Sequence, residues 1–150
     1  MHTIEGELFT ELVLEIFKLN GLLLSEGDRL AGKHNLSSAR WKVLGAIALN
    51  ESPLTVAQIG REMGQARQSV QRIANELADA GFLEWLENPG DRRAMQLKLT
   101  AKGKRVYAKL ESEQAPWANA AVNGLSRREL EKTLSVIRQV SEYFGVQRSG

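Results

Sequence analysis

Apolar residues recur at spacings of three and four in two long stretches, one near each end of the chain. The first stretch runs from about residue 4 to residue 32, and the second begins after a Ser126-Arg127-Arg128-Glu129 capping box. These spacings place apolar side chains on one face of an α-helix. The sequence therefore predicts two long amphipathic helices, whose apolar faces exceed what one small domain can cover. The positions that we expect in a subunit interface are Leu8, Leu12, Ile16, Leu130, Leu134, Ile137 and Phe144.

Shorter elements are predicted between these two helices. Ser37 is placed to cap one helix, and Thr55 to cap another that ends near Met63. Thr55 and Gln58 match a capping box, in which each side chain bonds a backbone N–H at the start of the helix. Gly64 and the residue after it then give a tight turn.

The helix predicted over residues 66–80 has two chemically different faces. Val70, Ile73, Ala74 and Leu77 form its apolar stripe. Gln, Arg, Asn and Ser side chains occupy the opposite side, and such side chains can pair with base edges in a DNA major groove. A solvated amphipathic helix fits the same pattern, so this helix alone does not decide between the two interpretations.

A β-hairpin is predicted after Gly81, which ends the preceding helix. Leu83 and Trp85 lie in one strand and residues 97–99 in the next, with an Asn88-Pro89-Gly90-Asp91 turn between them. Arg92 and Arg93 follow this turn, where arginine suits a narrow and electronegative minor groove. The alternative is an exposed hairpin whose charges serve solubility.

Composition and charge narrow the class of protein. The chain has 150 residues, a net charge of +2 and no cysteine, which excludes disulfides and thiolate chemistry. Residues 61–105 hold nine basic residues against six acidic ones, a local balance of +3. With no secretory leader or membrane-spanning apolar run, we expect a cytoplasmic protein. We expect a mainly α (α+β) fold in the order α-α-(β)-α-α-β-wing-β-α-α.

At this point the chain resembles the MarR family of transcriptional regulators. The resemblance rests on Asn88-Pro-x-Asp-Arg-Arg93 followed by Leu97-x-Leu-Thr100-x-x-Gly103, after a helix-turn-helix. It implies a homodimer that binds a pseudo-palindromic DNA site, with Arg93 in the minor groove and Asp91 steadying it. Trp85 stands where many members have arginine, which removes one expected phosphate contact.

The resemblance and the pattern together give the predicted site. Residues 36–100 form the DNA-binding lobe of a single 1–150 domain, and residues 1–35 and 101–150 pair the subunits. The expected DNA contacts are Thr55, Arg67, Gln68, Ser69, Gln71, Arg72, Asn75, Asp91, Arg92 and Arg93.

The family often senses small aromatic or phenolic ligands, and element order places Phe17, His34 and Trp41 near such a cleft. Phe17 and Trp41 are more simply explained as core residues, and His34 as a surface or capping residue. No metal site, cofactor or catalytic residue is expected, because the two histidines and the acids form no recognisable constellation.

The function predicted is a DNA-binding regulator, most simply a repressor. The rival interpretations are an enzyme and a winged helix that binds only protein.

Overall fold

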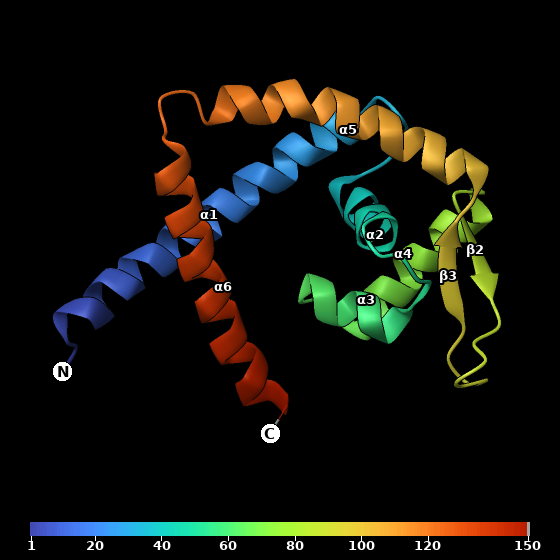
Figure 1. Ribbon diagram of the computed structural model, residues 1–150, viewed down its shortest axis with the longest axis horizontal. Coiled ribbons are helices and arrows are strands. Elements are labelled where there is room, and N and C mark those ends of the chain that lie inside the picture. The colour runs from blue at the N-terminus through green and yellow to red at the C-terminus, as the bar shows by residue number, and fades with distance from the viewer. Residues whose placement is uncertain (150) are drawn as a thin grey trace. The chain divides into compact units, whose positions relative to one another are not determined.

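The computed structural model describes residues 1–149, with side chains to residue 145, and is mainly helical with one small antiparallel sheet (Figure 1). The predicted fold class and element order are confirmed. The elements are α1 (Ile4–Gly32), α2 (Ser38–Ala48), β1 (Leu54–Thr55), α3 (Val56–Met63), α4 (Arg67–Asp79), β2 (Leu83–Leu86), β3 (Gln96–Leu99), α5 (Ala101–Ala121) and α6 (Arg127–Ser149).

The chain forms two compact units, residues 1–114 and the part that begins at Ala115. The boundary falls inside α5, which continues past Pro116 to Ala121. Proline lacks the N–H that a helix interior needs, so Pro116 removes one helical hydrogen bond beside the boundary. Pro116 therefore weakens α5 at the boundary between the units.

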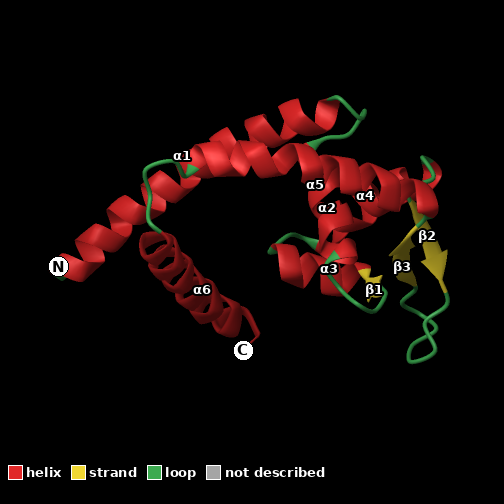
Figure 2. Ribbon diagram, turned by 45° about the horizontal axis from the view of Figure 1, so that its top comes forward, coloured by secondary structure: helices red, strands yellow, loops and turns green. Residues whose placement is uncertain are grey.

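Three strands in the order β1-β3-β2 make the sheet of the first unit. Leu83 pairs with Leu99 and Glu84 with Lys98 across β2 and β3. Since side chains alternate between the two faces of a strand, this register directs leucines inward and polar residues outward. Glu84 and Lys98 form an ion pair of 2.8 Å on the outer face. Figure 2 shows the loop that joins β2 and β3 projecting beyond the helices of this unit.

The core of the first unit lies between α2, α3, α4 and the sheet. Its fully buried members come from every one of these elements, so each helix is fixed by its apolar face. The apolar stripe predicted for α4 is buried throughout. The largest fully buried side chains are Leu44, Ile59, Leu77, Leu97, Leu110, Val43 and Val70.

Helix α5 begins at a tight junction with the end of α4. The Thr100 hydroxyl donates to the carbonyl of Gly81 at 2.6 Å and accepts the N–H of Gly103 at 3.0 Å. A Cβ at Gly103 would collide with the carbonyl of Phe82, so glycine is required there. The Leu97-x-Leu-Thr100-x-x-Gly103 motif therefore has a structural purpose, which is to seat α5 against the start of the hairpin.

In the second unit, the predicted capping box opens α6. The Ser126 N–H donates to the Glu129 carboxylate at 2.8 Å, and the Glu129 N–H donates to the Ser126 hydroxyl at 3.1 Å. The hydrogen bond from the Ser126 backbone N–H, with a contribution from the Ser126 side chain, lowers the pKa of the Glu129 carboxyl. The apolar residues predicted on this helix, such as Leu134 and Phe144, are 46% and 51% exposed.

Over the described residues, no helix combines the length and the apolar character that crossing a bilayer requires.

Candidate nucleic-acid interface

Helix α4 presents the polar face that the sequence predicts. Val70, Ile73, Ala74 and Leu77 are buried against the core, which turns the opposite side of the helix to solvent. Every predicted DNA contact on this helix is exposed. These residues are Arg67, Gln68, Ser69, Gln71, Arg72 and Asn75.

The turn between α3 and α4 sets the orientation of this face. Gly64 adopts a left-handed conformation (φ 64°), which glycine reaches without steric cost. The N–H of Gln65 then bonds the carbonyl of Gly60 at 2.9 Å, which ties the turn to α3. At the start of α3, Thr55 and Gln58 form the predicted capping box, with hydrogen bonds of 3.2 and 2.9 Å. The helix-turn-helix therefore follows from local backbone chemistry.

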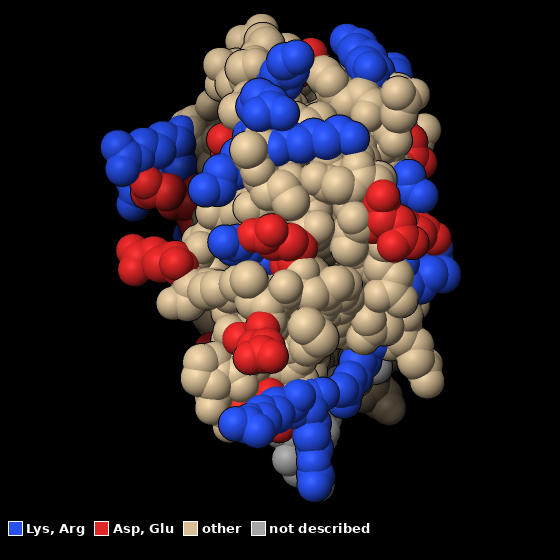
Figure 3. All heavy atoms as spheres, turned by 90° about the vertical axis from the view of Figure 1, so that its right-hand side faces the viewer, with Lys and Arg blue, Asp and Glu red and all other residues tan. Residues whose placement is uncertain are grey.

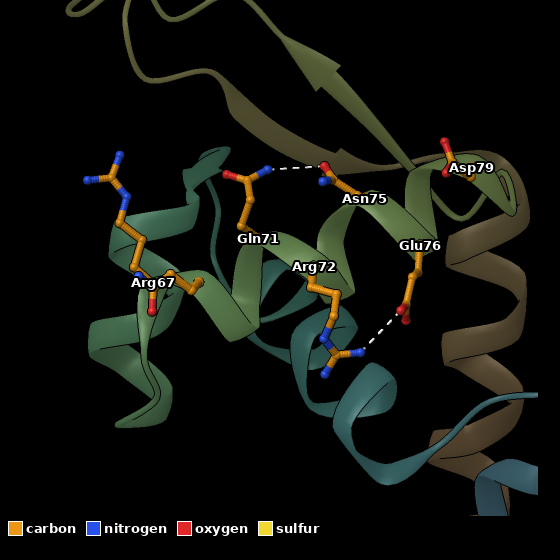
Figure 4. A pocket seen from close by; sticks show the side chains of 7 residues that line it. Arg67, Gln71, Arg72, Asn75, Glu76 and Asp79 are labelled. Atoms are coloured by element: carbon orange, nitrogen blue, oxygen red, sulfur yellow. Dashed lines mark hydrogen bonds and ion pairs between the residues drawn. The ribbon is translucent and has the colours of Figure 1, made fainter.

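Two side-chain pairs organise the exposed face of α4 (Figure 4). The Gln71 amide donates to the Asn75 side-chain oxygen at 3.1 Å, on the side of the helix nearer the strands. Arg72 Nη1 donates to Glu76 Oε1, also at 3.1 Å, on the other side of the helix. Both pairs have the i,i+4 spacing that brings side chains together on a helix. Asp79 completes the lining of this shallow concave face.

Arg40 of α2 reaches the same carboxylate from a different helix. Its Nη2 and Nε lie 3.0 and 3.3 Å from Glu76 Oε2. The hydrogen bond from Arg40 is the main reason that the pKa of Glu76 lies below its ordinary value, and Arg72 adds to the effect. Glu76 is therefore ionised at neutral pH, between two arginines.

The hairpin loop is held by short backbone and side-chain hydrogen bonds. Asn88 Oδ1 accepts the N–H of Gly90 at 3.1 Å, and Asp91 Oδ1 accepts the N–H of Arg93 at 3.0 Å. Asp91 thus steadies the backbone at Arg93. Both Arg92 and Arg93 are exposed.

A groove between the start of α3, helix α4 and the hairpin brings these parts together. Arg93 lines it from the hairpin, opposite Arg67, Gln71 and Asn75 of α4. Thr55 lines its end at the start of α3. The remaining lining residues are Val56, Ala57, Trp85, Ala94 and Met95.

Five predicted contacts therefore share the groove, while Gln68 and Arg72 line the adjoining concave face of α4. The prediction missed Arg40, Glu76 and Met95. The spacing of Arg72 and Glu76 was a usable signal for their pairing. No local signal points to Arg40, which lies 36 residues before Glu76 in the chain.

Charge is unevenly spread over the side of the molecule that carries the hairpin. Figure 3 shows Lys and Arg side chains at the top and bottom of this side, while its middle holds acidic side chains together with further basic ones. One basic group lies at the end where the hairpin loop projects in Figure 1. A local excess of positive charge attracts a phosphate backbone even when net charge is small.

The three residues predicted to contact an effector have different surroundings. Phe17 is 69% exposed on α1, whereas Trp41 of α2 packs against the core. His34 Nε2 lies 3.2 Å from both carboxylate oxygens of Glu113. Among the described residues, no group of three or more His, Asp or Glu side chains is placed to hold a metal ion.

Comparison with known proteins identifies the family. The MarR family model matches residues 34–94. An uncharacterized protein of Mycobacterium tuberculosis is 33% identical over 129 residues, which cover 86% of this chain and 89% of the relative. The HTH-type transcriptional regulator TcaR of Staphylococcus aureus is 26% identical, with 84% and 83% of the two chains covered.

Among solved structures, Staphylococcus aureus MarR in complex with salicylate and kanamycin has the same fold, with a TM-score of 0.73 at 21% identity. The match covers 92% of this chain and 93% of that protein. The winged helix, the groove beside α4 and these relatives agree with the resemblance seen in the sequence. The chain therefore belongs to the MarR family of DNA-binding transcriptional regulators.

Proposed function

We propose that the protein is a sequence-specific repressor that binds a pseudo-palindromic DNA site as a homodimer. The observation that supports this best is the groove in which Arg93 of the hairpin faces Arg67, Gln71 and Asn75 of α4. A winged helix that binds DNA needs its helix and its wing on one side, so that the helix enters the major groove while the wing reaches the minor groove. Members of this family are generally not enzymes, and we infer the same of this chain.

The two parts of this surface are proposed to have different roles. Side chains on α4 read base edges, because glutamine and asparagine can pair with adenine and arginine with guanine. Gln68 and Asn75 are the candidates for adenine and Arg72 the candidate for guanine. Arg92 and Arg93 of the hairpin contact the minor groove and the phosphates, which contributes affinity rather than sequence preference. Arg67, Ser69 and Thr55 complete the contact at the start of the helices.

Pairing of two subunits is proposed from the apolar residues exposed in each unit. Leu8 and Leu19, eleven residues apart on one face of α1, are 60% and 52% exposed, and α6 exposes Leu134, Ile137 and Phe144. Apolar side chains that recur at helical spacing and remain exposed usually mark an interface. We therefore assign residues 1–35 and 101–150 to dimerisation and residues 36–100 to DNA binding. Two α4 helices would then meet half-sites ~34–36 Å apart, one turn of B-DNA.

A small aromatic effector is proposed to release the protein from DNA. The related Staphylococcus aureus MarR has been solved with salicylate bound. In this chain Phe17, His34 and Trp41 are the candidate contacts, and His34 with Glu113 supplies a polar pair of 3.2 Å. A ligand that binds one spacing of the two α4 helices better than another would change DNA affinity by shifting that equilibrium.

Selection of bound duplexes from a random pool tests this proposal. We expect an inverted repeat whose halves are one helical turn apart. Titration of the recovered site should also show affinity falling steeply with salt. The logarithm of the binding constant, plotted against the logarithm of salt concentration, should have a slope of about −0.9 for each phosphate contacted. A pool without enrichment, together with a flat salt dependence, would favour a winged helix that binds only protein.

A further inference from the structure

Glu76 joins two arginines that come from different helices. Its Oε2 accepts hydrogen bonds from Nη2 and Nε of Arg40, at 3.0 and 3.3 Å. Its Oε1 accepts one from Nη1 of Arg72, at 3.1 Å. The Arg72 side chain is 66% exposed, whereas Arg40 and Glu76 are 37% and 36% exposed. Glu76 thus links an exposed arginine on the polar face to a more sheltered arginine on α2.

A carboxylate on this face requires an explanation, because it would repel DNA phosphates if it stood alone. Its two arginine partners leave the group of three with a net charge of +1. Free carboxylates can also accept a hydrogen bond from cytosine in the major groove. Both oxygens of Glu76 already accept hydrogen bonds from arginine, so these contacts compete with that use.

The contact with Glu76 also limits how Arg72 can point. An exposed arginine loses much rotamer freedom when it binds. A hydrogen bond through Nη1 holds the side chain in one orientation beforehand, while the edge formed by Nε and Nη2 stays available. Two donors side by side on one edge match the O6 and N7 acceptors of guanine. Figure 4 shows Arg72 directed toward Glu76 along one side of α4.

We propose that Glu76, held in place by Arg40, is a positioning residue that presents the guanidinium of Arg72 for bidentate recognition of guanine. This inference rests on the proposed function, since it requires α4 to lie in a major groove. Arg40 anchors the arrangement from the first turn of α2, where its own N–H bonds the Ser37 hydroxyl at 3.2 Å. The two hydrogen bonds from Arg40 keep the carboxylate fixed, so that Arg72 stays oriented while its free edge binds the base.

Asp79 offers a matched control for a test of this role. Asp79 is an exposed acid that lines the same concave face of α4. Glu76→Ala and Asp79→Ala each remove one negative charge from this face, so both should raise affinity for random duplex to a similar extent. Only Glu76→Ala also frees Arg72. The quantity to measure is selectivity, the ratio of the Kd for random duplex to the Kd for the selected site.

We expect Glu76→Ala to lower selectivity by about fivefold or more, the lower end of what a bidentate arginine–base pair contributes. Asp79→Ala should leave it unchanged. A repeated selection should show that Glu76→Ala relaxes the preference at the same base pair as Arg72→Ala. Arg40→Gln should act in the same direction as Glu76→Ala, because it removes the fork that holds the carboxylate.

A double-mutant cycle separates positioning from support of the fold. If Glu76 acts through Arg72, then Glu76→Ala has no further effect on selectivity once Arg72 is alanine. An equal loss with and without Arg72, or equal behaviour of the Glu76 and Asp79 variants, would overturn the inference. If the wild-type protein itself selects no site, it is the proposed function that fails, which is a distinct outcome.

Discussion

The exposed arginines of the proposed DNA surface differ in what holds them. Arg72 is tied through its side chain to Glu76, whereas Arg93 is fixed through its backbone N–H by Asp91. A guanidinium whose orientation is set suits a base edge. One that remains free to move suits the phosphates and the minor groove, where position along the groove matters less. The difference in restraint therefore matches the difference in proposed role.

Replacing Arg93 with alanine should weaken binding to every duplex, specific or random. Arg93 is exposed and lines the groove, so its loss removes a phosphate or minor-groove contact and leaves the core intact. In a titration against salt, we expect the slope to become shallower by about 0.9 for one lost phosphate contact. Lys109→Ala, an exposed cation on α5 outside that groove, is the control and should leave the slope alone. Unchanged binding by the Arg93 variant would show that the wing assignment is wrong.

Replacing Gln68 with alanine should have a different effect. Gln68 is exposed and is the second residue of α4. It lies at the end of the helix that enters a groove in helix-turn-helix proteins. Loss of a base contact there should cost ~1–3 kcal/mol on the selected site and little on random DNA. Fluorescence anisotropy with both duplexes measures this. Equal losses on the two would mean that Gln68 contacts the backbone.

At the scale of elements, the junction of α4, the hairpin and α5 sets the position of the wing. Thr100 bonds the end of α4 and the start of α5 at once, and Gly103 lets α5 approach the carbonyl of Phe82. The aliphatic strand residues Leu83 and Leu99 pair across the hairpin and are buried. The hairpin thus projects from a rigid base, so its arginines keep a fixed relation to α4.

Gly103→Ala should therefore destabilise the protein. An added Cβ would collide with the Phe82 carbonyl, and only movement of the backbone can relieve this collision. Overpacking of this kind costs about 1–3 kcal/mol. Urea unfolding measures the free energy. Gly45→Ala is the control, because a Cβ in the middle of α2 meets only ordinary contacts with Tyr107 at 3.6 Å. Alanine there should be neutral or stabilising by about 0.5–1 kcal/mol. Equal unfolding free energies for the two variants would contradict this role of Gly103.

The elements could be predicted because their signals are local. The capping box of Thr55 and Gln58, and the stripe from Val70 to Leu77, join residues that are three or four positions apart. The groove could be predicted only in part. Trp85 and Met95 line the groove together with residues of α4, and periodicity does not show which side chains the fold brings to the two sides of a groove. Arg40 was missed for the same reason.

At the scale of the whole molecule, the two units expose apolar residues that neither unit covers by itself. In the first unit these lie along α1, and in the second along α6. Burial of such surface in a symmetric interface would pair the DNA-binding lobes of two subunits. The spacing of the two DNA-binding lobes then depends on this interface. Residues far from the DNA should therefore control which DNA sites are bound.

Leu8→Glu should separate the subunits without unfolding them. Leu8 is 60% exposed in the single chain, so a carboxylate is tolerated there in a monomer but would be buried without a partner in a dimer. Sedimentation at micromolar concentration should give about twice the 16.7 kDa of one chain for the wild type and one chain mass for the variant. Thr10→Glu adds the same single charge at an exposed polar position, about 200° around α1 from Leu8, and should leave the dimer intact. Since one α4 helix reads only half of a palindrome, the monomeric variant should also lose most of its affinity for the full site while keeping that for a single half-site. A wild-type mass of one chain would contradict the dimer, and a monomeric variant that keeps full affinity would show that pairing is not what aligns the two α4 helices.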